Sequence, residues 1–542
     1  MGLSGGDGHR FSWLKTSAIS VAQRGRSRGS SARYVMLPKE LGKGHVELTV
    51  TGVWFEIRIG VRIAGKWTGE IRMGRMDIAT ASLAELITAL RAGTLSAGDL
   101  ADWAIGNHDT RGEAFHAYKT WDQGRLRAQA VAADAAFAAG VDLGALQGIP
   151  VSIKDLVGVS GYPTYAGCPR ELPENWQTEG PVVTAIRHQL GVVSGKTHTV
   201  QFAFGGLGVN PHWGPPRNPW DAQDHRSPGG SSSGAGVSLH EGSALLAIGT
   251  DTAGSVRMPA TMTGNAGFRP TPGRWSTDGI VPLVKSLDTA GPLARSVDDL
   301  VIGFGAIDPR VDEDAVVFRD RLSQAELGDF RVGICDWYFE DCDPGIAETV
   351  MAALDELSKA GLRTEVVKMP HFDDVTDLFN AGGLHVGEFS AFIKDEMRDF
   401  EADLDPAVAI RLAKAESDTA VEHLNRVKAV TRMARVVDDN YGGLHAIIGP
   451  TIPLTPPRMI DIADPESHFV ANMRLVRNTN TASLLKLCAM TVPVGLDAEN
   501  MPVGMQIVSR ENHDEIALAL ALACERVLGT SRDRLGVPPM CR

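Results

Sequence analysis

The sequence lacks the marks of a membrane, metal-binding or disulfide-linked protein. The apolar run from Ile516 to Cys524 is far shorter than the ~18 to 20 residues that a membrane-spanning helix needs. Its six cysteines include no C-x-x-C pair, and its 15 histidines include no H-E-x-x-H spacing. We therefore predict no transmembrane helix, no metal site and no disulfide framework, and we expect a cytoplasmic protein with reduced thiols.

Positive charge is scarce outside the first part of the chain. Residues 1–75 hold 13 basic and 5 acidic side chains, which leaves 40 basic and 61 acidic ones for the rest, a net charge of −21. The main body is therefore not expected to bind nucleic acid. Residues 1–75 form a basic extension, and the Ser, Gly and Arg content of residues 1–35 is typical of disorder or of a transit segment. We favour a third interpretation, a non-native upstream start, because a clean domain opening follows Met76.

Short patterns within residues 76–542 predict an α/β fold. Apolar residues recur at helical spacing from Leu83 to Leu90, with Ser82 as a cap and Gly93 as a stop. A second, Ala-rich helix is expected over residues 124–139. The segments GIPVSIKDL (148–156) and ALLAIGTD (244–251) read as short buried strands. Before the domain, the alternating residues 46–63 predict a hairpin broken at Gly52, to which we assign no function.

The first segment that carries chemistry ends in Lys154. A lysine at the end of an apolar strand can enter a buried pocket, where burial disfavours its charge and lets the neutral amine act as a base. Most lysines at strand ends are solvated surface residues, so this signal is weak when taken alone.

The second segment is SPGGSSSGAG (227–236), whose glycines leave serine hydroxyls and backbone amides accessible. It lacks the lysine of a phosphate-binding P-loop. It matches a G-x-S-x-G elbow with Ser232 as nucleophile, but the elbow must follow a buried strand, and a polar, proline-broken stretch precedes it. A flexible Gly/Ser surface loop is the remaining structural alternative.

The third segment, GTDTAGSVRMPA (249–260), places a tight turn and Ser255 after a buried strand. Backbone N–H groups in such a turn can converge on one point, as an oxyanion hole requires, and each donor is worth ~3 to 4 kcal/mol in the transition state. An ordinary strand-to-helix turn capped by Ser255 is the competing interpretation.

Together and in this order, the three segments resemble the amidase signature family. The resemblance continues through GKTHTVQFAFGGLGVNPHWGPPRNPWD, GFRPTPGRWS, SLDTAGPLARSVDDL and MPVGMQIVSRENHDE, so it covers roughly residues 76–530. It implies Ser255 as nucleophile, Ser231 as relay serine after a cis Gly230–Ser231 bond, and Lys154 as base. It implies that these residues cleave a carboxamide through an acyl-enzyme, with no metal or organic cofactor.

The same resemblance suggests supporting roles for residues around the triad. Backbone amides of Thr252, Ala253, Gly254 and Ser255 would hold the oxyanion. Ser232 is expected near the lysine, with Asp251 and Arg257 bracing the nucleophile loop, although ordinary turn stabilisation explains these three nearly as well. The sequence departs from the family pattern at two positions. Ala253 replaces a usual glycine, which would strain the turn if that residue required a positive φ. Gln201 replaces a frequent acid.

The fold implied by the resemblance is one α/β/α domain around a large mixed sheet. Residues 308–441 match the family least clearly, and substrate selectivity is expected to lie there. The expected ligand is a small-molecule amide, and a homodimer is expected from the resemblance alone. Other functions stay open: a glutamine-hydrolysing subunit of a tRNA-dependent amidotransferase, an esterase, and a non-catalytic binding protein.

Overall fold

The computed structural model describes two compact units, Met1–Asp77 and Ile78–Arg542. The described residues are 32–36, 44–51, 54–60, 62–63, 66–67, 71–72, 76–415 and 418–542. Residues 1–31 of the predicted basic extension lie outside them. All six cysteines lie inside them, and none forms a disulfide.

The first unit contains short antiparallel strands. Strands β1 (Ala32–Met36), β2 (Gly44–Thr51), β3 (Trp54–Gly60) and β6 (Ile71–Arg72) form one sheet in that order, and β4 (Arg62–Ile63) pairs with β5 (Lys66–Trp67). Strands β2 and β3 pair antiparallel, with Thr51 opposite Trp54, and Gly52, the predicted break, lies outside the described residues. The alternating segment therefore forms a hairpin, as strands with a period of two residues do.

The second unit is built on a mixed sheet of 11 strands within the described residues, in the order β14-β13-β15-β17-β16-β11-β12-β10-β8-β9-β7. This confirms the predicted α/β fold around a large mixed sheet. The strands are β7 (Tyr118–Trp121), β8 (Pro150–Lys154), β9 (Val192–Thr197), β10 (Leu246–Asp251), β11 (Ala266–Arg269), β12 (Thr289–Ala294), β13 (Arg331–Cys335), β14 (Arg363–Val367), β15 (Ala446–Pro450), β16 (Cys488–Leu496) and β17 (Pro502–Ser509).

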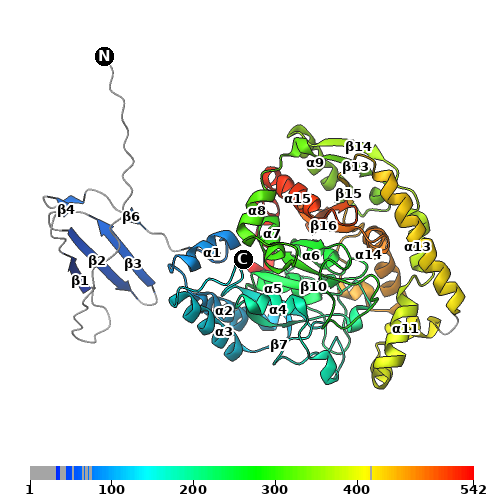
Figure 1. The fold of residues 1–542 in the computed structure, drawn as a ribbon, viewed down its shortest axis with the longest axis horizontal. Coiled ribbons are helices and arrows are strands. Elements are labelled where there is room, and N and C mark those ends of the chain that lie inside the picture. Colours follow the sequence, from blue (N-terminus) through cyan, green and yellow to red (C-terminus); the bar gives the residue numbers. More distant parts are fainter. Residues whose placement is uncertain are drawn as a thin grey trace, which may run out of the picture. The chain divides into compact units, whose positions relative to one another are not determined.

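Helices surround this sheet (Figure 1). They are α1 (Leu83–Arg91), α2 (Ala97–Phe115), α3 (Gln123–Ala138), α4 (Pro181–His188), α5 (Ser233–Glu241), α6 (Arg257–Thr263), α7 (Val297–Ile307), α8 (Ala315–Leu322), α9 (Ile346–Lys359), α10 (Phe372–Asn380), α11 (His385–Glu396), α12 (Pro406–Ala415), α13 (Ala420–Tyr441), α14 (Pro465–Leu484), α15 (Asp514–Leu528) and α16 (Ser531–Leu535). Near the C-terminus, α15 lies beside α7 and α8 from the middle of the chain (Figure 1). Across the described ranges, no helix combines the length and apolar character that a membrane crossing requires.

The predicted boundaries of the first helices are close to those observed. Ser82 caps α1, accepting a hydrogen bond from the amide of Glu85, and the side chain of Glu85 accepts one from the amide of Ser82. Gly93 follows the helix with φ +66°, a conformation that glycine adopts without steric cost. The expected Ala-rich helix over residues 124–139 is α3.

The sheet brings the three chemical segments to one edge. Strands β8 and β10 are parallel neighbours, with Ile153 opposite Ile248, so their carboxyl ends meet. Both strands are completely buried, which explains why they read as apolar runs. Lys154 ends β8, Asp251 ends β10, and α5 begins at Ser233, directly after the serine pair of the second segment.

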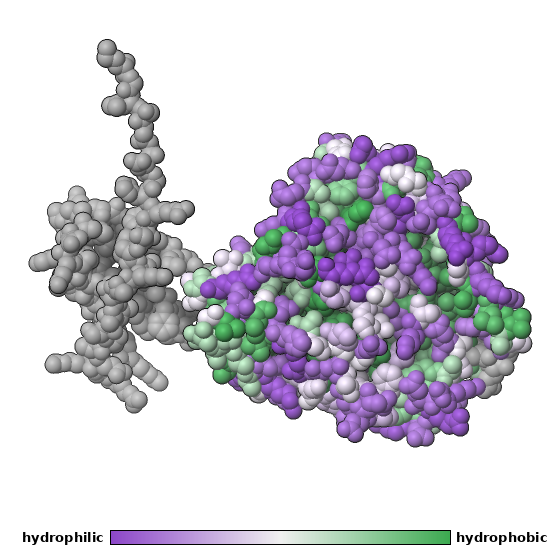
Figure 2. Space-filling model, viewed as in Figure 1, coloured by the Kyte–Doolittle hydropathy of each residue, from purple (hydrophilic) through white to green (hydrophobic). Residues whose placement is uncertain are grey.

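Helices α10, α11 and α12, with α14 beside α10, come from the part of the chain around residues 372–484. The molecular face drawn in Figure 2 mixes polar surface with apolar patches. Apolar side chains of this region are exposed at Ile410 (70%) and Phe469 (54%), and both also line a cavity described below. These helices therefore present apolar surface at the mouth of a cavity rather than only to the core.

Candidate active site

Lys154 lies completely buried at the end of β8. Its Nζ is 2.7 Å from the Oγ of Ser231 and 2.8 Å from the Oγ1 of Thr250. Burial lowers the pKa of Lys154 to about 7, while the charges of Asp288 and Asp251 act in the opposite direction. The lysine of the first segment is thus not a solvated surface residue, and its neutral form is accessible near pH 7.

Ser231 and Ser232 lie at the start of α5 and are both buried. The peptide bond between Gly230 and Ser231 is cis. Ser232 does not contact Lys154 directly. Its Oγ is 3.2 Å from the carbonyl oxygen of Thr250 and 3.3 Å from the amide of Thr250, so it holds the backbone of the residue that the lysine contacts.

Ser255 lies in the turn between β10 and α6, which we call the serine turn (residues 251–257). It is 4% exposed and lines a cavity. The amide of Ser232 donates to the carbonyl oxygen of Ser255 at 3.3 Å, which ties the serine turn to the start of α5. Within the described part of the chain, no hydrogen bond joins the side chains of Ser231 and Ser255.

The backbone amides of the serine turn are not all free. The amide of Gly254 donates to the Oδ1 of Asp251 at 2.8 Å, so it is already used inside the turn. The amides of Thr252, Ala253 and Ser255 form no hydrogen bond within the described residues, and all three residues line the cavity. These three amides are the ones available to an oxyanion.

The turn accommodates Ala253 without strain. Ala253 is not among the residues with positive φ, whereas Gly254 has φ +132°. A Cβ at Gly254 would lie 2.3 Å from the Oγ1 of Thr479. The conformational demand therefore falls on Gly254, and the replacement of the usual glycine by Ala253 is harmless to the backbone.

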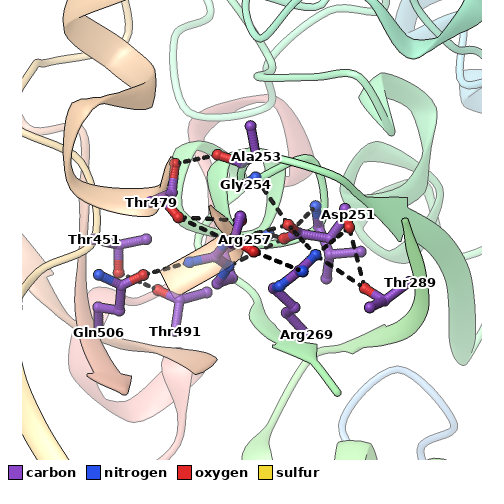
Figure 3. A network of polar contacts seen from close by, with 12 residues as sticks. Asp251, Ala253, Gly254, Arg257, Arg269, Thr289, Thr451, Thr479, Thr491 and Gln506 are labelled. Carbon is purple, nitrogen blue, oxygen red and sulfur yellow. Dashed lines mark hydrogen bonds and ion pairs between the residues drawn. The ribbon is translucent and has the colours of Figure 1, made fainter. Parts of the chain in front are cut away.

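Asp251 is the centre of a buried ionic network below the turn (Figure 3). Its carboxylate is 3.0 Å from both the Nε and the Nη2 of Arg257, and the guanidinium of Arg269 also contacts it. Burial opposes the charge of Asp251, but the two arginines hold its pKa far below the usual range. Asp251 and Arg257 thus brace the serine turn in the structure.

Arg257 also connects the turn to distant elements. Its Nη1 donates to Gln506 on β17 at 2.6 Å, and its Nη2 donates to the carbonyl oxygen of Thr479 on α14 at 3.1 Å. Thr479 in turn donates its hydroxyl to the carbonyl oxygen of Ala253 at 2.6 Å (Figure 3). The serine turn is therefore held by two elements that are distant in the sequence, β17 and α14.

Three residues of this site were not assigned a role from the sequence. Thr250 contacts Lys154, Arg269 contacts Asp251, and Asp288 accepts a hydrogen bond from Thr252 at 2.5 Å. Each of them lies inside a quoted family segment. Their contacts join segments that are far apart in the sequence, so only the segments could be found, not the pairings.

The cavity beside Ser255 has a volume of about 320 Å³. Its floor includes Thr252, Ala253 and Ser255, and Leu283 and Met258 border it. We call the opposite side, formed by α10, α11 and α12, the helical wall. It contributes Phe379, Asn380, His385, Val386, Ile410 and Arg411. Part of the region that matches the family least thus lines the cavity.

Arg411 and His385 are the basic side chains that line this cavity. The Nη1 of Arg411 donates to the carbonyl oxygen of Phe204 at 2.9 Å, and its guanidinium lies over the ring of Phe204. His385 is buried, and neither ring nitrogen has a hydrogen-bond partner among the described residues. Burial lowers the pKa of His385 to about 3, so its imidazole is neutral at neutral pH.

Metal ligands do not gather at this site. In the residues that the structure describes, no group of three or more His, Cys, Asp or Glu side chains is placed to hold a metal ion. The groups that gather at the serine turn and the start of α5 are instead serine and threonine hydroxyls, the buried amine of Lys154 and backbone amides. This set suits nucleophilic acyl transfer.

Comparison with known proteins assigns the family. The family model "Amidase" matches residues 108–518, more than half of the chain.

The chain belongs to the amidase family. It is therefore a hydrolase that acts on carbon–nitrogen bonds.

Two curated relatives differ in their similarity to this amidase. It is 45% identical over 470 residues to 2-amino-5-chloromuconic acid deaminase of Comamonas testosteroni, an alignment that covers 86% of this chain and 100% of the relative. It is 30% identical over 486 residues to a glutamyl-tRNA(Gln) amidotransferase subunit of Anaeromyxobacter sp. (strain K), covering 84% of this chain and 97% of that protein.

A solved structure agrees with this assignment. An amidase crystal structure matches with a TM-score of 0.74 and 27% identity, covering 83% of this chain and 100% of that chain. A peptide amidase bound to chymostatin, at 24% identity and a TM-score of 0.70, shares the fold and covers 85% of this chain and 99% of its own.

Proposed function

We propose that this amidase releases ammonia or an amine from a small carboxylic acid derivative through an acyl-enzyme on Ser255. The contact between Lys154 and Ser231 carries this proposal. Lys154 is completely buried and lies 2.7 Å from a serine hydroxyl. Because burial lowers its pKa to about 7, it can act as a base at neutral pH.

The proposed chemistry passes protons along Ser255, Ser231 and Lys154 and breaks one carbon–nitrogen bond. Neutral Lys154 takes the proton of Ser231, Ser231 takes the proton of Ser255, and the Oγ of Ser255 attacks the carbonyl carbon. The amides of Thr252, Ala253 and Ser255 hold the developing oxyanion. Ser231 gives this proton to the leaving nitrogen and is reprotonated by Lys154, which becomes neutral again, and water then hydrolyses the ester at Ser255. Approach of substrate must bring the hydroxyls of Ser231 and Ser255 into hydrogen-bond reach.

An acidic substrate fits the cavity. Its lining combines apolar side chains such as Phe379 and Val476 with the guanidinium of Arg411, which matches the geometry of a carboxylate. The relative with 45% identity is named for the deamination of an unsaturated acid, 2-amino-5-chloromuconic acid. Both observations support a carboxamide substrate that also carries a carboxylate.

The first experiment measures ammonia release from a panel of carboxamides, with and without a carboxylate elsewhere in the molecule. Wild-type protein is compared with Ser255→Ala and with Ser358→Ala, which changes an exposed serine on α9. We expect release to fall by about 10⁴-fold or more in Ser255→Ala and to stay unchanged in Ser358→Ala. Equal release by wild type and Ser255→Ala would contradict the proposal.

Three further measurements, beginning with labelling by a fluorophosphonate probe, separate the alternative functions. Stoichiometric labelling of Ser255 excludes a non-catalytic binding protein. Preference for esters over matched amides would favour the esterase. Glutamine hydrolysis that appears only with partner subunits would favour the amidotransferase, whose relative shares 30% identity with this chain against 45% for the deaminase.

The proposal extends to the setting of the enzyme. A cytoplasmic location is supported by six cysteines that are all unpaired in the structure, as in a reducing compartment. We also propose that residues 76–542 form the amidase domain, since the family model lies within them. The homodimer stays a prediction, and light scattering of the purified protein tests it.

A further inference from the structure

Asp288 lies directly before β12, beside the serine turn. It is 8% exposed. Its Oδ1 accepts a hydrogen bond from the hydroxyl of Thr252 at 2.5 Å, and its Oδ2 accepts from the amides of Leu283 and Val284 at 2.9 and 3.0 Å. Thr252 and Leu283 both line the catalytic cavity. One carboxylate therefore joins the floor of the cavity to its border.

The charge of Asp288 is balanced differently from that of Asp251. Asp251 forms ion pairs with both Arg257 and Arg269. Asp288 forms no ion pair with a described residue, and its partners are one hydroxyl and two amides. Both carboxylates act on the pKa of Lys154, and Asp288 is the one of the two that forms no ion pair with a described arginine.

Titratable groups approach Asp288 from several sides. The charge of Arg269 on β11 acts on the pKa of Asp288. Asp288 acts in turn on the pKa of Lys154 on β8, as does Asp251 on β10. On its other side a second cavity, of about 610 Å³, is lined by Asp288 together with the charged residues Arg274, Asp278, Lys285, Lys486 and Glu511. Asp288 therefore lies between the catalytic cavity and a second cavity that both acidic and basic residues line.

We propose that Asp288 is a positioning residue that orients Thr252 toward the reacting carbonyl and sets the charge state of Lys154. The inference rests on the proposed function, in which Lys154 is the base. Burial raises the pKa of Asp288 to about 6, and the ionised carboxylate in turn opposes the depression of the pKa of Lys154. Above about pH 6 the carboxylate thus favours protonated Lys154, and its removal favours the neutral base.

The test uses two substitutions of the same residue in the full chain. Asp288→Asn removes the charge, whereas Asp288→Glu keeps the charge and disturbs the contact with Thr252. The rate of fluorophosphonate labelling at Ser255 is measured across pH, so no natural substrate is needed. We expect the acid limb of Asp288→Asn to move down by about one pH unit. Asp288→Glu should keep the limb of the wild type but label about tenfold more slowly.

A purely structural role predicts a different result. Both variants would then lose rate or stability while their acid limbs stay where the wild-type limb lies, and this outcome overturns the inference. If neither variant folds, Thr252→Val tests the positioning half, because it removes the hydroxyl that Asp288 holds. We expect about a tenfold loss of kcat with KM unchanged, and an unchanged kcat overturns the inference.

Failure of the proposed function has a separate signature. If wild-type protein is not labelled at Ser255 at any pH, the proposed function fails and the inference fails with it. If wild type is labelled and its rate falls below about pH 7, but Asp288→Asn gives the same limb, only the role of Asp288 is overturned.

Discussion

The serine turn and the helical wall face the same cavity but satisfy their polar groups in different ways. In the serine turn, the buried carboxylate of Asp251 is bound by two arginines and by backbone amides. In the helical wall, His385 is buried with both ring nitrogens unpartnered within the described residues, and one nitrogen of Arg411 binds a single carbonyl oxygen.

This difference fits a division of roles, in which the serine turn holds the proposed catalytic groups and the helical wall selects the substrate. Catalytic groups must stay within a few tenths of an ångström of their working positions, and a saturated buried network provides this rigidity. A binding wall must leave polar groups for the substrate to satisfy, because unpaired buried groups reward the ligand that pairs them. Substitutions in the serine turn should therefore affect all substrates, and those in the helical wall only some.

The largest effect is expected from Arg257→Met. This change leaves the carboxylate of Asp251 buried with only Arg269 beside it, and breaking a buried ion pair from one side costs about 3 to 5 kcal/mol. We expect a markedly lower midpoint of urea unfolding. The control is Lys359→Ala, which removes an exposed pair with Asp355 and should change stability by less than about 0.5 kcal/mol. Equal midpoints for both variants would show that the network does not stabilise the turn.

A second effect depends on pH and should be common to all substrates. Neutral Lys154 is the proposed base and its pKa is lowered to about 7, so the active fraction is lost as pH falls through about 7. We expect kcat/KM to fall about tenfold per pH unit below that point and to level off above it. Stopped-time assays of ammonia release across pH measure this limb. A flat profile between about pH 5 and 8 would show that no base titrates there.

A third and smaller effect should depend on the substrate. Arg411→Met removes the guanidinium from the helical wall, and a charged hydrogen bond of this kind is worth about 1.5 to 3 kcal/mol. We expect kcat/KM for substrates with a second carboxylate to fall about 10- to 100-fold, with neutral amides unaffected. Arg170→Met is the matched control, because Arg170 pairs with Asp403 outside the cavity lining. A parallel loss for neutral amides would assign Arg411 to folding rather than to selection.

The smallest effect is expected from residues outside both the serine turn and the helical wall. The relative with 45% identity is aligned over its whole length to 86% of this chain, so a full-length amidase of the family needs no counterpart of the remainder. Removal of residues 1–75 should leave kcat/KM within about twofold of the full chain, measured with the best substrate of the panel. A loss of tenfold or more would show that the basic extension takes part in activity.

Much of the fold was accessible from local patterns. The buried runs around Ile153 and Ile248 predict strands, and Ser82 and Gly93 predict the start and the end of α1, because each signal depends on neighbouring residues only. The helical wall was predicted only as the place where selectivity lies. Its helices pair α10 with α14 and place Arg411 against Phe204, contacts between segments about 90 and 200 residues apart, which no local periodicity encodes.

By itself, the sequence predicted which residues would carry the proposed chemistry, since Lys154, Ser231 and Ser255 stand in segments whose composition and order resemble those of the amidase family. The tertiary structure decided what those residues can do. Burial lowers the pKa of Lys154, the amide of Gly254 is used inside its own turn, and Asp288 reaches Thr252. Charge states and donor availability depend on which distant groups surround an atom, and only the folded chain fixes those surroundings.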